Sequence, residues 1–245
     1  MCPNAPKLIK LELWQKALLS CMYGVLDADG NRQFREVLLV EARKNGKSIL
    51  AAAIAKYDWV LDGGYGSRVY TIAPKLEQAD IIYGNIWQMV TLDPEWKALK
   101  AEYTDKKSRR ELGDNPNLAR HRQTDLYLPA NNGMVKKIAF SAKKSDGFNP
   151  SLCVCDEIAA WEGDKGLKQY EVMKSGMGAR PDGLLLSCTT SGYINDSIYD
   201  ELVKRATRFL QGGSKAVPVI PKGQDRFGKG FAVHVGLVEH VREPP

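Results

Sequence analysis

The sequence has no apolar run long enough to cross a membrane. A membrane-spanning helix needs about eighteen or more consecutive apolar residues, and no stretch of this chain approaches that length. The first ten residues also lack the basic and then apolar plan of a secretory signal peptide. We therefore expect a soluble protein that works inside a cell, with no membrane partner.

Cysteine and histidine are both scarce. The five cysteines are odd in number, and Cys153, Cys155 and Cys188 lie in apolar runs where they would pack as small hydrophobic side chains. Cys153 and Cys155 would share one face of a strand, but no second pair with metal-ligand spacing accompanies them. The three histidines do not cluster with cysteines or acids. We therefore predict no disulfide framework, no zinc site and no histidine catalysis.

The net charge of +6 is concentrated in one part of the chain. Residues 97 to 144 contain twelve Lys and Arg against five Asp and Glu. Such a stretch can hold a nucleic-acid backbone by releasing its counterions, and its few aromatic side chains favour a DNA duplex over a stacked single strand. The alternative interpretation is a solvated basic surface without a partner. The candidate DNA-binding residues are Lys106, Lys107, Arg109 and Arg110.

A strand, a loop and a helix are predicted between residues 35 and 64. The segment REVLLVEA (35 to 42) has the apolar middle of a strand, and ILAAAIAKYDWVLDGG (49 to 64) is rich in helix-forming residues and ends on two glycines. The segment EARKNGKS (41 to 48) joins them and ends like the phosphate-binding pattern Gly-x-x-x-x-Gly-Lys-[Ser/Thr]. Glu41 stands in place of its first glycine, so the match is partial.

Three further segments predict strands, and two of them end in polar residues. Residues 68 to 73 form the first. PSLCVCDEIAAW (150 to 161) predicts a buried strand that ends in Asp156 and Glu157, as the Walker B motif of a nucleotide hydrolase requires. GLLLSCTTSGY (183 to 193) predicts another strand that ends in hydroxyl side chains. Strands alternating with helices predict an α/β fold of the P-loop NTPase type, with an open, mostly parallel sheet flanked by helices.

Five segments follow one another along the chain: LWQ, EARKNGKS, YTIAPKLEQA, DGFNPSLCVCDEIAAW and SCTTSG. Their order and spacing resemble the ATPase domain of bacteriophage large terminase subunits of the HK97-like type, the motors that package DNA into capsids. The resemblance covers about residues 8 to 211. In that family the phosphate-binding loop commonly lacks the first glycine and carries an arginine, so Glu41 fits the pattern.

The resemblance implies roles around ATP and Mg²⁺. Glu157 would be the catalytic carboxylate, and Ser48 and Asp156 would hold Mg²⁺. Arg43 resembles the family's catalytic arginine, although which of Arg43 and Lys44 faces the phosphates stays open. The nucleotide-binding residues implied by the resemblance are Gln15, Arg43, Lys44, Asn45, Gly46, Lys47 and Ser48.

Two further roles are implied by the resemblance. Gln15 resembles a glutamine that reads adenine through its amide, with Trp14 packing nearby; a surface amide and a core indole are the alternative. A run of hydroxyl residues resembles the motif that couples hydrolysis to movement, and an ordinary turn is its alternative interpretation. The residues of this run are Thr189, Thr190, Ser191 and Gly192.

The resemblance also sets the expected domains and partners. Residues 1–211 would form the ATPase motor domain, and residues 212–245 an atypical tail or linker; no room remains for the family's nuclease domain, so we expect no nuclease activity. The implied partners are double-stranded DNA, a portal protein and a small terminase subunit. A homo-oligomeric ring on the procapsid, in the cytoplasm of the bacterial host, is the implied setting.

Two competing functions stay open for this sequence. One is a helicase-like, nucleic-acid-dependent ATPase of the same broad class, although its further motifs are not found in the remaining length. The other is a truncated prophage remnant that binds nucleotide or DNA without turnover. The presence of Lys47, Ser48, Asp156 and Glu157 argues against inactive chemistry.

Overall fold

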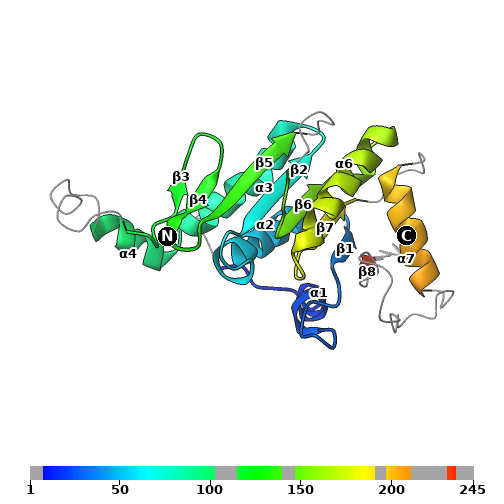
Figure 1. Ribbon diagram of the computed structural model, residues 1–245, viewed down its shortest axis with the longest axis horizontal. Coiled ribbons are helices and arrows are strands. Elements are labelled where there is room, and N and C mark those ends of the chain that lie inside the picture. The colour runs from blue at the N-terminus through cyan, green and yellow to red at the C-terminus, as the bar shows by residue number, and fades with distance from the viewer. Residues whose placement is uncertain (1–7, 103–114, 140–146, 191–196, 211–230, 236–245) are drawn as a thin grey trace, which may run out of the picture.

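The protein is built on one eight-stranded sheet flanked by helices (Figure 1). The computed structural model describes residues 8–102, 115–139, 147–190, 197–210 and 231–235. The strand order is β3-β4-β5-β2-β6-β7-β1-β8. The strands are β1 (Glu36–Val40), β2 (Arg68–Ala73), β3 (Arg120–His121), β4 (Leu126–Leu128), β5 (Gly133–Ala139), β6 (Leu152–Asp156), β7 (Leu184–Thr189) and β8 (Phe231–Val235).

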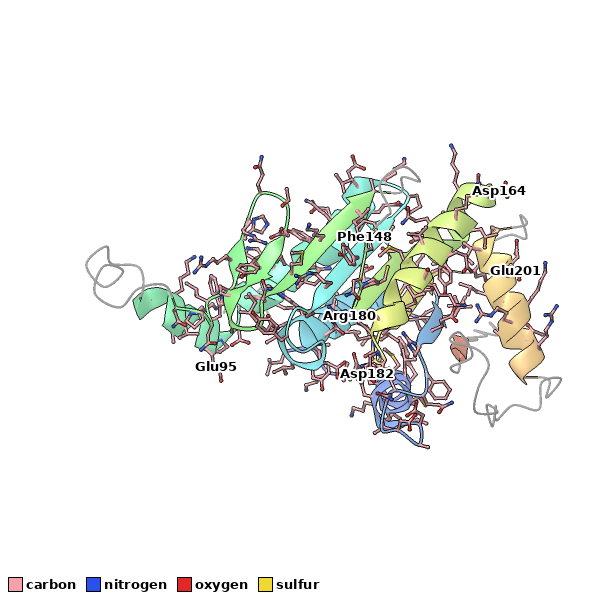
Figure 2. The ribbon with its side chains drawn as sticks, viewed as in Figure 1. Glu95, Phe148, Asp164, Arg180, Asp182 and Glu201 are labelled. Carbon is pink, nitrogen blue, oxygen red and sulfur yellow. The ribbon has the colours of Figure 1, made fainter. Side chains whose placement is uncertain are left out.

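Helices cover both faces of the sheet and create two cores. One core packs α1 (Leu13–Gly24), α2 (Lys47–Tyr57) and α3 (Leu76–Thr91) on one face, with α4 (Pro94–Glu102) beside α3. The other packs α6 (Gly163–Gly176) and α7 (Ile198–Leu210) on the opposite face. Asp164 on α6 and Glu201 on α7 mark the exposed side of this second layer (Figure 2).

Successive side chains along the central strands enter the two cores in turn. On β6, Leu152 and Val154 enter the first core, whereas Cys153 and Cys155 enter the second. The two cysteines share a face, as predicted, with their Sγ atoms 3.7 Å apart. A sheet covered on both faces needs apolar residues at every position, which explains why the central strands read as continuous apolar runs.

The central strands are parallel and bring three strand ends together. β7 lies between β1 and β6, pairing Val40 with Thr189 and Asp156 with Cys188. The carboxyl ends of β1, β6 and β7 therefore meet at one edge of the sheet, where ligands bind in open α/β sheets. The predicted fold class is confirmed.

Several elements were not anticipated from the sequence. β3, β4 and β5 lie within or beside the basic segment, where β4 pairs antiparallel with both of its neighbours. After α2 the chain continues through one π-helical turn, η1 (Asp58–Asp62), before Gly63. β8 belongs to the segment predicted as a tail or linker, yet it pairs in parallel with β1 and extends the sheet. In the described part of the chain, no helix has the length and apolar character that a membrane crossing demands.

Candidate nucleotide-binding and hydrolysis site

The loop between β1 and α2 has the backbone shape of a phosphate cradle. Gly46, the residue before the helix, has φ 79°, a left-handed conformation that suits glycine because it has no Cβ. Two of the three described non-glycine residues with positive φ also lie at this site: Lys44 (φ 67°) in the loop and Glu157 (φ 51°) after β6. Such strained residues concentrate at ligand sites because the surrounding structure must enforce them.

Glu41, which replaces the usual first glycine, braces this loop from inside. The residue is only 3% exposed. Its Oε1 accepts hydrogen bonds from the backbone N–H of Ala42 (3.0 Å) and from Nδ2 of Asn45 (2.7 Å). This role was not predicted, because no local sequence pattern indicates that a carboxylate at this position folds back onto its own loop.

Lys47 holds its ammonium group against the same loop. The residue is 8% exposed, and its Nζ donates to the backbone carbonyls of Glu41 (2.7 Å) and Ala42 (2.9 Å). Ser48, half-buried, follows in the first turn of α2. The free N–H groups of this turn and the positive end of the helix dipole favour an anion here. The predicted residues from Asn45 to Ser48 are thus gathered at one helix start.

Asp156 and Glu157 lie at the carboxyl end of β6. Burial, and then the neighbouring Glu157 carboxylate, raise the pKa of Asp156 to about 6, while the Glu157 backbone N–H and the charge of Lys47 act in the opposite direction. Lys47 and Asp156 are therefore close enough to influence each other electrostatically. Glu157 is half-buried and begins the short helix η3 (Ile158–Ala160). A cation beside this acidic pair would relieve its repulsion.

Thr189, at the end of β7, forms hydrogen bonds with both the phosphate loop and the turn after Glu157. Its backbone carbonyl accepts from the N–H of Glu41 at 3.1 Å. Its Oγ1 accepts from the N–H of Ala159 at 3.3 Å and donates to the carbonyl of Thr190 at 2.8 Å. Thr189 thus connects the phosphate loop to the turn that follows Glu157. The remaining predicted coupling residues, Ser191 and Gly192, lie outside the described residues.

A cavity of about 620 Å³ opens beside the loop. Gln15, only 7% exposed, and Trp14 contribute to its wall from α1, and Lys44 contributes from the loop. Arg43 is exposed and does not belong to this lining. The lining residues are Ile9, Lys10, Leu11, Glu12, Trp14, Gln15, Lys44, Asn45, Gly46, Ile49, Leu50 and Ala53.

The predicted DNA-binding residues Lys106, Lys107, Arg109 and Arg110 lie outside the described residues. Two basic side chains from the described part of the basic segment are neutralised locally. Arg122 pairs with Asp125 at 2.6 Å, and Lys137 pairs with Asp80 at 2.5 Å.

The donor set suits Mg²⁺ better than zinc. Mg²⁺ prefers oxygen ligands and keeps part of its water shell, so one hydroxyl and one carboxylate suffice beside substrate phosphates. Ser48 and Asp156 would provide these oxygens. Within the described ranges, no group of three or more His, Cys, Asp and Glu residues is placed to enclose a metal ion.

Two of the comparisons with known proteins found matches. Among solved structures, the large terminase of bacteriophage HK97 matches with 20% identity and a TM-score of 0.64, covering 84% of this chain and 38% of that one. The large terminase ATPase domain of Thermus phage P74-26 matches with 20% identity and a TM-score of 0.51, covering 91% of this chain and 80% of that one. At this identity the two likenesses show the fold.

The chain spans little more than a third of the HK97 protein. A search of curated proteins returns no match. The family model described as terminase large subunit, ATPase domain, matches residues 13–208, which is most of the chain. The protein therefore belongs to the terminase large subunit ATPase domain family.

Proposed function

We propose that this domain binds ATP with Mg²⁺ between the β1–α2 loop and the end of β6, hydrolyses it, and uses the reaction to move double-stranded DNA. The observation that carries the proposal is the convergence of Lys47, the Asp156–Glu157 pair and Thr189 at three adjoining strand ends. A phosphate cradle, an acidic pair and a connecting hydroxyl are the parts that a nucleotide-driven motor requires.

Phosphate binding would use groups that are already in place. The N–H groups at the start of α2, from Gly46 onward, would donate to phosphate oxygens. Lys47 would exchange its two carbonyl partners for phosphate oxygens as well. The bracing of the loop by Glu41 lowers the entropy lost on binding, because Asn45 and Ala42 are held before the nucleotide arrives. The cavity beside Gln15 would receive the base.

Ser48 and Asp156 are the oxygen ligands that would hold Mg²⁺. The ion would neutralise charge on the phosphates as the bond to the γ-phosphoryl group breaks. Asp156 must be deprotonated to serve as a ligand, and its raised pKa of about 6 still leaves it mainly ionised at neutral pH. Lys47, whose charge favours the ionised form of Asp156, supports that state.

Glu157 would orient the attacking water. The water oxygen forms a bond to the γ-phosphorus, the bond between this phosphorus and the oxygen bridging to the β-phosphate breaks, and the departing electron pair stays with ADP. The Glu157 carboxylate accepts the water proton. The planar guanidinium of Arg43, or the ammonium of Lys44, would stabilise the negative charge spread over the transferring group.

Loss of the γ-phosphate would be sensed through Thr189. Its hydroxyl is bonded to the turn after Glu157, and its carbonyl to the start of the phosphate loop, so a shift in either segment changes its contacts. Thr190, Ser191 and Gly192 follow directly and would carry that change towards the DNA. Hydroxyl groups suit this role because they exchange donor and acceptor partners without a large change in shape.

The basic segment would hold the duplex. Changing Lys106, Lys107, Arg109 and Arg110 to alanine should weaken duplex binding and reduce its salt slope by about one for each phosphate contact removed. A matched control removes four exposed charges from the other layer, namely Lys165, Lys168, Lys204 and Arg208. Equal salt slopes for the two variants would show that the basic segment is a solvated surface that does not contact the duplex. A portal protein, a small terminase subunit and a ring of copies in the bacterial cytoplasm complete the proposed machine.

The nucleotide site is tested by ATP binding to Lys47→Ala beside Lys56→Ala. Both lysines lie on α2, but Lys56 is near its other end and pairs with Asp93 at 3.1 Å. We expect Lys47→Ala to lose ATP affinity by at least about tenfold, since a charge-assisted contact contributes about 1.5 to 3 kcal/mol, while Lys56→Ala binds normally. Equal affinities in the two variants would contradict the proposed site.

A further inference from the structure

The indole of Trp161 contacts the turn that carries the acidic pair. Trp161 is only 1% exposed and packs in the second core with Ile158 and Tyr170. Its Nε1–H donates to the backbone carbonyl of Asp156 at 2.9 Å. The backbone of α6 lies close by, since a Cβ added to Gly166 would be 2.6 Å from the Trp161 carbonyl oxygen. The side chain is thus enclosed by apolar neighbours and hydrogen-bonded through its one polar atom.

Glu157 has a backbone conformation that its surroundings must enforce. Its φ of 51° lies in the left-handed region, which is uncommon for a residue with a Cβ. The carbonyl of Asp156 belongs to the peptide group that ends at the Glu157 nitrogen. A rotation of this peptide group would change φ of Glu157 and turn its carboxylate in a new direction. The Trp161 N–H holds the peptide group in one orientation.

The sheet holds Asp156 but not Glu157. Asp156 is the last residue of β6 and pairs with Cys188 of β7. Glu157 lies beyond this pairing, and on its carboxyl side the turn is closed by the N–H of Ala160, which donates to the Glu157 carbonyl at 2.8 Å. The Trp161 indole acts on the amino side of Glu157. Loss of the indole N–H should therefore disturb the Glu157 carboxylate more than that of Asp156.

We propose that Trp161 is a positioning residue for hydrolysis, whose indole N–H keeps the Glu157 carboxylate directed at the attacking water. This inference rests on the proposed function, in which Glu157 orients that water and accepts its proton. A general base acts only within hydrogen-bond reach of the proton that it takes. The contact matters in the transition state and not in ATP binding, so its loss should lower the rate of hydrolysis and leave ATP affinity unchanged.

Trp59 provides a matched control. It is also fully buried, in the first core, and within the described residues its Nε1 has no hydrogen-bond partner. A change from tryptophan to phenylalanine removes the same volume at both positions. Only Trp161→Phe also removes a hydrogen bond, so comparing it with Trp59→Phe separates the hydrogen bond from the loss of packing.

The measurements are the single-turnover rate of ATP hydrolysis with Mg²⁺ and the dissociation constant of ATP, for the whole chain. We expect Trp161→Phe to lower the rate by about tenfold, the equivalent of about 1.4 kcal/mol, and to bind ATP within about twofold of wild type. Trp59→Phe should keep both values within about twofold of wild type. Urea unfolding checks that each variant is folded in the assay.

Two further variants test whether the indole N–H acts through Glu157. In the Glu157→Gln background the carboxylate is already gone, so adding Trp161→Phe should lower the rate by less than about twofold more. Replacing Trp161 by benzothienylalanine puts sulfur in place of the N–H and keeps the shape of the side chain. This variant should lose about tenfold in rate, and it replaces Trp161→Phe in the comparison if the phenylalanine variant does not fold.

The outcomes separate this inference from the proposed function. A wild-type rate in Trp161→Phe or in the benzothienylalanine variant would overturn the inference and leave ATP hydrolysis standing. An equal loss in Trp59→Phe, or a further tenfold loss in the Glu157→Gln background, would also overturn it, since packing and not the position of Glu157 would then be responsible. Absence of hydrolysis by the wild-type chain would overturn the proposed function and this inference together.

Discussion

The hydroxyl of Thr189 accepts a hydrogen bond from the backbone N–H of Ala159 at 3.3 Å. These residues lie thirty positions apart in the chain, on the end of β7 and in the short helix after Glu157. The same threonine receives the N–H of Glu41 on its carbonyl. One residue therefore bridges the phosphate loop and the turn that follows Glu157.

Replacing Thr189 by valine should uncouple hydrolysis from binding. Valine keeps the branched shape but leaves the Ala159 N–H and the Thr190 carbonyl without their partner. We expect ATP affinity within about twofold of wild type and a turnover rate lower by about tenfold, which corresponds to about 1.4 kcal/mol of transition-state stabilisation. Steady-state phosphate release measures the rate. Thr189→Ser, which retains the hydroxyl, should stay close to wild type; a fall equal to that of the valine variant would contradict the role of the hydroxyl.

Replacing Glu41 by alanine should loosen the phosphate loop. The Asn45 amide and the Ala42 N–H would lose their shared acceptor, and the loop would have to be ordered by the nucleotide itself. We expect ATP affinity to fall by about tenfold, or about 1.4 kcal/mol, in a calorimetric titration. Glu41→Gln keeps an oxygen acceptor of the same shape and should bind nearly as wild type. Tight ATP binding by the alanine variant would show that the loop needs no brace.

The buried Asp58 should give the protein a component of stability that decreases as pH rises. Burial raises the pKa of Asp58 from 3.8 to about 6, although Ser151 Oγ donates to its carboxylate at 2.6 Å. The folded pKa exceeds the unfolded one, so the folded state binds the proton more tightly. The contribution is complete below about pH 3.8, decreases up to about pH 6 and is then lost.

Urea unfolding of wild type and Asp58→Asn at several pH values isolates this contribution. The difference between their unfolding free energies should change by about 3 kcal/mol between acid and neutral pH, with wild type relatively less stable at neutral pH. Taking the difference removes the opposite contribution of Glu36, whose pKa is lowered mainly by Arg205 against the effect of burial. A difference that does not vary with pH would contradict the raised pKa.

Glu36 should be among the most sensitive positions for stability. It is buried at the start of β1, where its carboxylate accepts from Tyr170 at 2.8 Å and pairs with Arg205 at 2.9 Å and Lys174 at 3.1 Å. Glu36→Ala would leave these groups without their shared acceptor, so we expect a loss of about 3 kcal/mol or more by urea unfolding.

The exposed Glu201, on the outer side of α7, provides the control for Glu36 (Figure 2). It lies 4.0 Å from Lys204, a separation at which a surface pair contributes little. Glu201→Ala should therefore change the unfolding free energy by less than about 1 kcal/mol. Similar losses in the two alanine variants would show that the Glu36 cluster has no special importance.

The elements that could be predicted are those indicated by a pattern in the neighbouring sequence. The strand before Glu41, the loop with Gly46 and the helix from Lys47 follow from a short pattern of apolar, glycine and helix-forming residues. The central strands likewise follow from continuous apolar runs bounded by polar ends. For these reasons the parallel sheet and the gathering of Lys47 and Asp156 at its edge could be predicted.

The elements that were missed depend on distant pairing. β5 pairs with β2 on one side and with β4 on the other, and its lysines hide the strand pattern within a run of positive charge. The bond from Ala159 to Thr189 depends on the register of β6 beside β7. The brace made by Glu41 depends on how a single side chain turns inside its loop. Neither contact leaves a pattern in the local sequence.

The most direct test of the proposed function is steady-state hydrolysis of ATP with Mg²⁺ by the wild-type chain, Lys47→Ala and Glu157→Gln, with and without duplex DNA. We expect hydrolysis by the wild type, stimulated by the duplex, and a loss of about 100-fold or more in both variants, with ATP binding retained by Glu157→Gln. Folded wild-type protein that releases phosphate no faster than the two variants would contradict the proposed function and favour a remnant that binds without turnover.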